Sequence, residues 1–324
     1  MFHKKQVKYI QWIFSIVAII IIPHFLDAYL IYISSLVCIF IILAIGLDLV
    51  IGYTGQISLC HAAFFAIGAY TSAILTTKAG IPFWFSMPLG AVTTALIGFC
   101  VGIPALRLGG LYLALVTLGF GEIVQMVTNN WILITNGPDG IVIPSPELVG
   151  FSFSSDLRVF YIIMPITICL VTIGRNIVQS NIGRAFIAVR DDEIAAQSFG
   201  MRLARYKTIS FSLSAFYAGI GGGLYTVTTN FICPTDFGIV TSIDVLAMIV
   251  IGGLGTIIGP IFGAILLTLL PEILRTIAEI KELAYGSLLL IFLIFMPGGI
   301  WGILSNLLIK VRMVFPLTTE KKVN

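Results

Sequence analysis

Long stretches without Asp, Glu, Lys or Arg run through this chain, and they decide in which solvent it can fold. Three of them cover residues 49–77, 159–174 and 208–235. An apolar run of about 20 residues is long enough to cross the hydrocarbon core of a bilayer as a helix. Only 10% of all residues are charged, against about a quarter in ordinary soluble domains. The pattern therefore predicts an all-α polytopic membrane protein, in which each helix satisfies its own backbone polar groups.

The apolar runs predict about ten transmembrane helices, two of them short or broken. Full spans are expected near residues 9–25, 29–47, 56–77, 83–106, 109–133, 158–174, 207–230 and 284–308, and short ones near 243–253 and 258–271. If the short pair is one re-entrant excursion, eight full spans remain. The first run is not followed by a small-residue cleavage site, so we expect it to stay in the protein as an uncleaved span.

Basic residues predict the orientation, because Lys and Arg accumulate on the cytoplasmic side. They occur before the first span, between residues 175 and 207, and after residue 309. Both termini and the 175–207 loop are therefore expected in the cytoplasm. The loop near 134–157 carries only acidic charges before Arg158, which places it outside. No separate soluble domain is expected, so residues 1–324 form one transmembrane domain.

The 175–207 loop is a charged segment between apolar stretches. We expect a soluble partner protein to bind such a loop. It contains the run Arg190, Asp191, Asp192, Glu193, followed by Ile194, Ala195, Ala196 and later Gly200. An aspartate can cap a helix, acidic residues suit its first turn, and glycine can end it. The pattern predicts a short helix on which the partner is seated at the two alanines. An ordinary solvated loop is the alternative.

Polar side chains inside the predicted spans are candidates for a translocation path. Glu122, Gln125 and Asn129 follow the spacing i, i+3, i+7 and so share one helix face. A carboxylate at membrane depth should face protein or water rather than lipid. Gln56 and His61 lie in another uncharged stretch. Hydrogen bonding between helices is the alternative for the first three residues, and packing is the alternative for His61.

Two short glycine patterns predict interruptions of the helices. Residues 51–55 and 251–255 both read Ile-Gly-x-x-Gly, one in each half of the chain. We expect helix breaks at these glycines, where freed backbone groups must line a cavity or be buried in protein. The glycines are Gly52, Gly55, Gly252, Gly253 and Gly255. Two related halves are common in transporters, and a match of five residues leaves that possibility open here.

Several kinds of chemistry have no motif in this chain. There is no P-loop, no HExxH or other metal-ligand cluster, and no GxSxG. The net charge of +3 gives no signal for nucleic acid, and the five cysteines are scattered. We therefore expect no catalytic residues, no bound metal and no cofactor in this chain. Energy for transport must come from a partner or from an ion gradient.

One family matches this pattern. The run from 183 to 225 resembles the cytoplasmic coupling segment of ABC-importer permeases, most closely the M-type subunit of branched-chain amino-acid uptake systems. Four further blocks match in the same order, and the resemblance covers about residues 30–305. The blocks are GYTGQISLCHAAFFAIGAY at 52–70, RLGGLYLALVTLGFGE at 107–122, TNGPDGI at 135–141 and VIGGLGTIIGPIFGA at 250–264.

The importer coupling motif reads Glu-Ala-Ala, three residues, then Gly, and this chain departs from it. Ala195, Ala196 and Gly200 fit, but Ile194 stands where the glutamate would be. The Ile-x-Leu-Pro ending that usually follows is absent. The resemblance nevertheless implies that residues 190–200 form the coupling site for an ATPase.

The resemblance also implies partners and a cargo. It implies a second homologous permease subunit, two cytoplasmic subunits that bind ATP and magnesium, and an extracytoplasmic substrate-binding protein. The chain would lie in a bacterial inner membrane and carry leucine, isoleucine or valine. Urea and short amides are the rival cargoes within the family.

Two other function classes remain open. An ion-coupled secondary transporter would use Glu122, Asp48 or His61 to carry the coupling ion. An intramembrane enzyme would use His61 and Glu122 as acid and base, which requires the two side chains to lie within hydrogen-bond reach.

Overall fold

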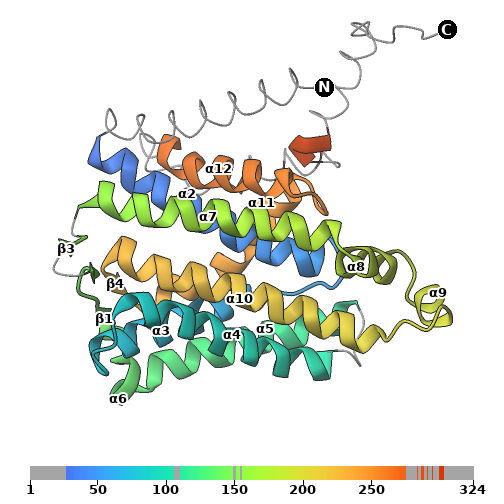
Figure 1. Ribbon diagram of the computed structural model, residues 1–324, viewed down its shortest axis with the longest axis horizontal. Helices are drawn as coiled ribbons and strands as arrows, with labels where there is room; N and C mark the ends of the chain where they lie inside the picture. The colour runs from blue at the N-terminus through green and yellow to red at the C-terminus, as the bar shows by residue number, and fades with distance from the viewer. Residues whose placement is uncertain are drawn as a thin grey trace, which may run out of the picture.

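The computed structural model describes residues 27–105, 110–148, 151–153 and 155–274, with isolated positions and short runs between 283 and 302. In this part of the chain, the protein is a bundle of helices with two very short strand pairs (Figure 1). The expected first span at 9–25 lies outside the described residues, and so does most of the last one at 284–308.

The described helices follow the predicted order. They are α2 (Ala28–Ile51), α3 (His61–Thr77), α4 (Phe83–Ala105), α5 (Leu111–Asn130), α6 (Ile132–Thr135), α7 (Asp156–Gln179), α8 (Asn181–Asp191), α9 (Glu193–Ser198), α10 (Leu203–Thr229), α11 (Ile239–Gly252) and α12 (Ile258–Ile273), with 3-10 turns η2 (Gly137–Asp139) and η3 (Pro234–Phe237). Among the described residues, α2, α4, α5 and α7 are long and apolar enough to cross a membrane, while α11 and α12 are shorter apolar helices. This agrees with a polytopic membrane protein; the number of spans and the sides of the termini stay predictions.

Helix α10 lies in the middle of the bundle, against α2, α3 and α4. Small residues every fourth position, Ala215, Gly219 and Gly223, let α4 approach closely. A Cβ atom at Gly219 would lie 2.7 Å from the Cα atom of Ala91, and one at Gly223 would lie 2.6 Å from Cγ of Met87. Helix α10 therefore lies directly against the Ala91 backbone and the Met87 side chain of α4, which leaves no room for a larger residue at these two glycines.

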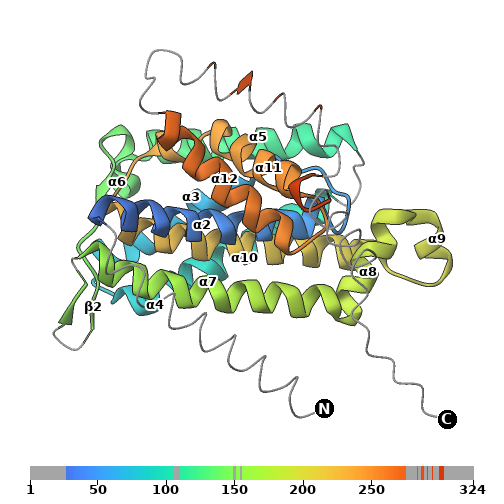
Figure 2. The same cartoon turned by 90° about the horizontal axis from the view of Figure 1, so that it is seen from above.

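Burial differs sharply between the spans. In the most apolar 18-residue stretch of α2, 61% is buried inside the protein, whereas in the corresponding stretch of α5 the share is 22%. Helix α2 is apolar all round, as expected for a helix surrounded by protein, and its residues 41–50 are all buried. Helix α5 lies at the edge of the bundle (Figure 2). Most of its surface is therefore left for lipid, water or another chain.

The two loops predicted on opposite sides lie at opposite ends of the bundle. Helices α8 and α9 project at one end, while α6 and the strand pairs lie at the other (Figure 1). Strand β1 (Ile141–Val142) pairs antiparallel with β4 (Phe231–Ile232), with Ile141 opposite Ile232. Strand β2 (Glu147–Leu148) pairs in the same sense with β3 (Phe151–Ser152). The β1–β4 pair ties the 134–157 loop to the end of α10, whereas the β2–β3 pair lies within the loop.

Two predicted boundaries differ from the observed helices by five residues. The span expected at 56–77 begins as a helix only at His61, and residues 55–60 have no helical structure. Hydroxyl groups of other helices accept hydrogen bonds from this segment, so an apolar run could leave the helical conformation there. The span expected to end at 174 continues in α7 to Gln179, and Arg175 is an exposed residue within this helix.

Candidate functional site

The short helix expected between Asp191 and Gly200 is present as α9. Asp192 caps it, since its Oδ1 atom accepts hydrogen bonds from the amides of Ile194 at 2.8 Å and Ala195 at 3.0 Å. Gly200 ends it with a φ of +80°, a conformation that glycine adopts without steric cost. Local sequence alone therefore encodes this helix.

The faces of α9 differ from the simple expectation of two accessible alanines. Ala195 is exposed, but Ala196 is only 4% exposed and is buried within the chain itself. The outermost apolar side chains are Ile194 at 79% and Phe199 at 88% exposure. Sequence reasoning did not single them out as contact residues. One feature of the sequence could have indicated an apolar contact surface: Ile194 stands where the importer motif has a glutamate.

One ion pair connects α9 to the central helix. The Nζ atom of Lys207, on α10, lies 2.7 Å from Oε1 of Glu193, the first residue of α9. The Lys207 side chain is 7% exposed and the Glu193 side chain 50%. A lysine so deeply buried requires a partner, so α9 is held to the first turns of α10.

The non-helical residue Leu59 and the first turn of α3 are held by hydroxyl groups of distant helices. The amide of Leu59 donates to Oγ1 of Thr117 on α5 at 3.0 Å, and the amide of Ala62 donates to Oγ of Ser242 on α11 at 2.9 Å. Freed backbone donors at membrane depth are tolerated only where protein satisfies them. Sequence reasoning missed Thr117 and Ser242, because hydroxyl residues are common in membrane helices and carry no distinct signal.

Gln56 and His61 lie in the interior, against α10. Gln56 donates through Nε2 to Oγ1 of Thr54 at 2.8 Å and Oγ of Ser210 at 3.1 Å. His61 is 1% exposed, and its Nδ1 atom lies 3.3 Å from Oγ of Ser214. These contacts favour a packing role for His61. No hydrogen bond joins His61 to Glu122, which the enzyme hypothesis requires.

The two glycine patterns lie directly against each other. Gly55, Gly253 and Gly255 have positive φ angles of +70°, +122° and +68°, so the chain turns there in a way that other residues rarely adopt. A Cβ atom at Gly52 would collide with the amide nitrogen of Gly255, and one at Gly255 would lie 3.0 Å from the Gly52 carbonyl oxygen. The predicted breaks of α2 and of α11–α12 thus form one junction.

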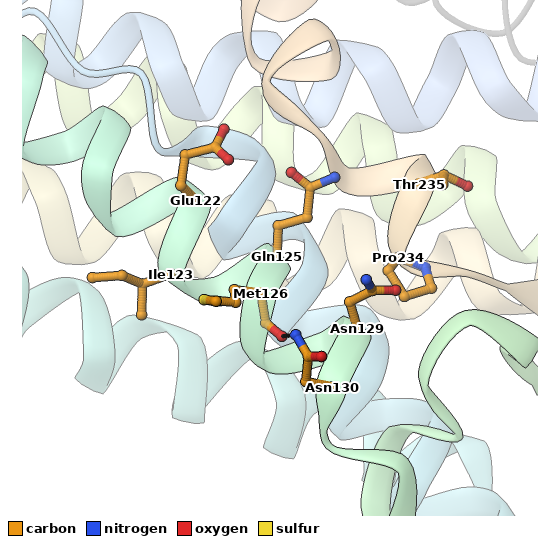
Figure 3. Close-up of a pocket in the computed structure, with 8 residues that line it drawn as sticks. All are labelled: Glu122, Ile123, Gln125, Met126, Asn129, Asn130, Pro234 and Thr235. Atoms are coloured by element: carbon orange, nitrogen blue, oxygen red, sulfur yellow. Dashed lines mark hydrogen bonds between the residues drawn. The ribbon is translucent and has the colours of Figure 1, made fainter.

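The face of α5 that carries Glu122, Gln125 and Asn129 borders an open cavity of about 540 Å³. Figure 3 shows the three polar side chains directed to the same side of α5, toward the turn that contains Pro234 and Thr235. The predicted stripe therefore exists, and the structure brings its three members together. Gln56 and His61 do not line this cavity.

The polar side chains of this cavity are available for other molecules. Among the described residues, Glu122, Gln125 and Asn129 have no side-chain hydrogen-bond partner. Asn130 differs, since it donates back to the carbonyl oxygen of Met126 at 2.8 Å (Figure 3). Hydrogen bonding between the described helices therefore does not account for the stripe. A carboxylate on a peripheral span must face protein or water, because lipid exposure costs a few kcal/mol.

A second, narrow cleft reaches Glu122 from the interior. It is lined by residues of α3, α5 and α11 together with Leu59, and has room for about one water molecule. Glu122 thus lies where the outer cavity meets the non-helical segment before α3. Among the described residues, no group of three His, Cys, Asp or Glu side chains could hold a metal ion.

Comparison with known proteins gives a consistent family. A family model described as the permease component of branched-chain amino acid transport systems matches residues 29–296. The LivM permease protein of high-affinity branched-chain amino acid transport from Salmonella typhimurium is 37% identical, over 83% of this chain and 69% of its own length.

More distant relatives are other importer permeases. The LivH permease protein of high-affinity branched-chain amino acid transport from Escherichia coli is 25% identical, over 81% of this chain and 90% of its own. The LsrC permease protein of autoinducer 2 import from an Escherichia coli strain is also 25% identical, over 87% and 84% of the two chains. No solved structure matches this chain.

Proposed function

Because this chain belongs to the family of branched-chain amino acid transport permeases, we propose that it is the membrane subunit of an ABC importer for leucine, isoleucine and valine. The observation that carries the proposal is similarity to LivM over most of the chain, together with the polar cavity on α5. The protein would lie in a bacterial inner membrane. ATP and magnesium would be bound by its partners.

The α5 cavity supplies the chemistry for a zwitterionic cargo. The Glu122 carboxylate can accept hydrogen bonds from an ammonium group, and the amides of Gln125 and Asn129 can donate to a carboxylate. Ile123 and Met126 are exposed beside them, at 61% and 69%, and offer apolar surface to an aliphatic side chain. This combination suits an amino acid with a hydrocarbon side chain.

A second permease subunit would cover the α5 cavity from outside. The cavity is open, and α5 is the least buried of the four long apolar helices. The relationship to both LivM and LivH, permease proteins named for one kind of transport, supports pairing of two homologous chains. The translocation path would then lie between the two permeases, with α5 as this chain's contribution.

Two cytoplasmic ATPase subunits would act through α9. Ile194 and Phe199 form the exposed apolar surface of this helix, which a soluble partner would bury. Movement of α9 would pass to α10 through the Glu193–Lys207 ion pair. An extracytoplasmic binding protein would deliver the amino acid at the opposite end, where α6 and the strand pairs lie.

The experiment is purification of the whole importer in mild detergent, with mass spectrometry of the co-purifying subunits and amino-acid uptake in proteoliposomes. The variant Ile194→Glu/Phe199→Glu should lose the P-loop ATPase and uptake, because charges would face an apolar contact. Leu133→Glu is the matched control, since Leu133 is 87% exposed on α6 at the other end. It should retain the ATPase.

Three outcomes would contradict parts of this proposal. Full recovery of the ATPase with the double variant would exclude this surface of α9 as the docking site. Accumulation of amino acid by vesicles that hold this chain alone and an ion gradient would favour a secondary transporter. Uptake of urea or short amides in preference to leucine would reassign the cargo.

A further inference from the structure

Arg190 is partly exposed, with 39% of its side chain accessible, and its guanidinium contacts the junction of the two glycine breaks. It is the last residue but one of α8 and the first of residues 190–200, which the family resemblance assigns to ATPase coupling. Its Nη1 atom donates to the carbonyl oxygen of Gly52 at 2.8 Å. Its Nε and Nη2 atoms both lie 3.1 Å from Oδ1 of Asp191. One guanidinium therefore connects the coupling loop with the end of α2.

Glycines at positions 55 and 255 allow the Arg190 side chain to approach the backbone closely. A Cβ atom at Gly55 would lie 3.0 Å from Cγ of Arg190, and one at Gly255 would lie 2.9 Å from Nη1. The side chain thus contacts the breaks of both halves, α2 on one side and α11–α12 on the other. A residue with only a solvent-exposed role would not require such close contacts.

Asp48 holds the same junction from the interior. It is 1% exposed on α2, and its Oδ1 atom accepts a hydrogen bond from the amide of Gly255 at 2.9 Å. Its Oδ2 atom accepts no hydrogen bond of normal geometry from the described residues. Arg190 donates to the Gly52 carbonyl and Asp48 accepts from the Gly255 amide. The two side chains therefore bind the two facing glycine segments of one junction.

We propose that Arg190 is a positioning residue that transmits movement of the coupling loop to the helix breaks at Gly52 and Gly255. The inference deepens the proposed function and rests on it. When the loop moves, the guanidinium carries the Gly52 carbonyl with it. Because Gly52 and Gly255 are in contact, and Asp48 bonds to Gly255, the breaks of α2 and α11–α12 move together. The Glu193–Lys207 pair acts on α10 separately, so the loop has two connections to the bundle.

Arginine suits this position better than lysine. Its planar group donates in several fixed directions at once, which allows the simultaneous contacts with the Gly52 carbonyl and the Asp191 carboxylate. The Gly52 carbonyl follows the C-terminal end of α2, where the helix dipole also favours a cation. The contact is therefore supported by charge as well as by geometry.

The test compares three variants of the whole importer in proteoliposomes, with leucine as the cargo. Arg190→Gln removes the positive charge and the contact of the guanidinium with the Gly52 carbonyl. Arg184→Gln is the matched control on the same helix, because the contacts of Arg184 are with Asn181 and the Gln179 carbonyl. Asp48→Asn combined with Arg190→Gln removes both charges, and so keeps the interior neutral if Arg190→Gln alone does not fold.

The readouts are recovery of the ATPase subunits and the amount of leucine taken up per ATP hydrolysed. We expect both Arg190 variants to retain the ATPase, and their uptake per ATP to fall about tenfold or more, the scale of one hydrogen bond to a charged group. The Asp48→Asn/Arg190→Gln variant should recover thermal stability without recovering this ratio. If Arg190 had a merely structural role, the double variant would recover both thermal stability and the uptake of leucine per ATP hydrolysed.

Three results would overturn the inference. Loss of the ATPase with Arg190→Gln but not with Arg184→Gln would make Arg190 a docking residue instead. A normal uptake ratio in the double variant would reduce Arg190 to a neutraliser of Asp48. An equal loss in Arg184→Gln would show a general effect of charge on α8. If the unaltered importer does not transport leucine, the proposed function fails instead, and the result is recognised before any variant is tested.

Discussion

The ion pair between Glu193 and Lys207 should contribute measurably to stability, unlike most ion pairs on protein surfaces. Exposed pairs contribute about 0–1 kcal/mol, whereas removing one partner of a buried pair costs about 3–5 kcal/mol. Here the lysine side chain is 7% exposed and the glutamate 50%, at a distance of 2.7 Å. The pair is therefore intermediate, and we expect a coupling energy of about 1–2 kcal/mol, below that of a fully buried pair.

A double-mutant cycle measures this energy. The variants are Glu193→Gln, Lys207→Met and the two combined, since methionine keeps most of the apolar stem of lysine. The free energy of unfolding is followed by titration with sodium dodecyl sulfate in mixed micelles. Glu193→Gln alone should be destabilising, because it leaves a buried ammonium with a weaker partner. The double variant should be less unstable than the sum of the single variants.

The reasoning fails if the coupling energy is below about 0.5 kcal/mol, the scale at which independent sites add. The pair would then be a contact without consequence, and the connection from α9 to α10 would have to be sought elsewhere. A coupling energy in the expected range should also be visible in function. The same variants should reduce uptake per ATP hydrolysed, because α9 would be less firmly attached to α10.

Two further changes test the packing and the path. Gly219→Val should lower the yield of folded protein by overpacking against Ala91, at a cost of about 1–3 kcal/mol or more, as measured by size-exclusion chromatography; Gly119→Ala, which meets no atom within 4 Å, should not. Glu122→Gln should raise the KM for leucine about tenfold or more, the scale of a charge-assisted hydrogen bond. Asn130→Ala is its control in the uptake assay, and equal effects of the two would argue against a substrate contact.

Features set by neighbouring residues could be predicted from the sequence. Helix α9 is one of them, because its cap at Asp192 and its end at Gly200 lie within the same ten residues. The polar face of α5 is another, since helical spacing places Glu122, Gln125 and Asn129 together. Each of these depends on local geometry that the order of residues determines.

Features set by contacts between distant segments could not be predicted. The helix α3 begins at His61 and not at 56 because hydroxyls of Thr117 and Ser242 satisfy backbone donors there. Ala196 is buried by the chain's own fold, so its place in a motif said nothing about its exposure. The repeated glycine pattern was visible in the sequence, but its meaning is a contact between two breaks about 200 residues apart, with Asp48 bonded to Gly255.

The start of α3, with Leu59 before it, also constrains how the protein is made. The Ala62 amide depends on a hydroxyl that is synthesised 180 residues later, and the Leu59 amide depends on one in α5. Until those helices arrive, these donors would face lipid without partners, which is unfavourable by several kcal/mol each. Insertion of α3 therefore cannot be completed in the order of synthesis. The nascent chain must keep this segment near water or the insertion machinery until α11 has emerged from the ribosome.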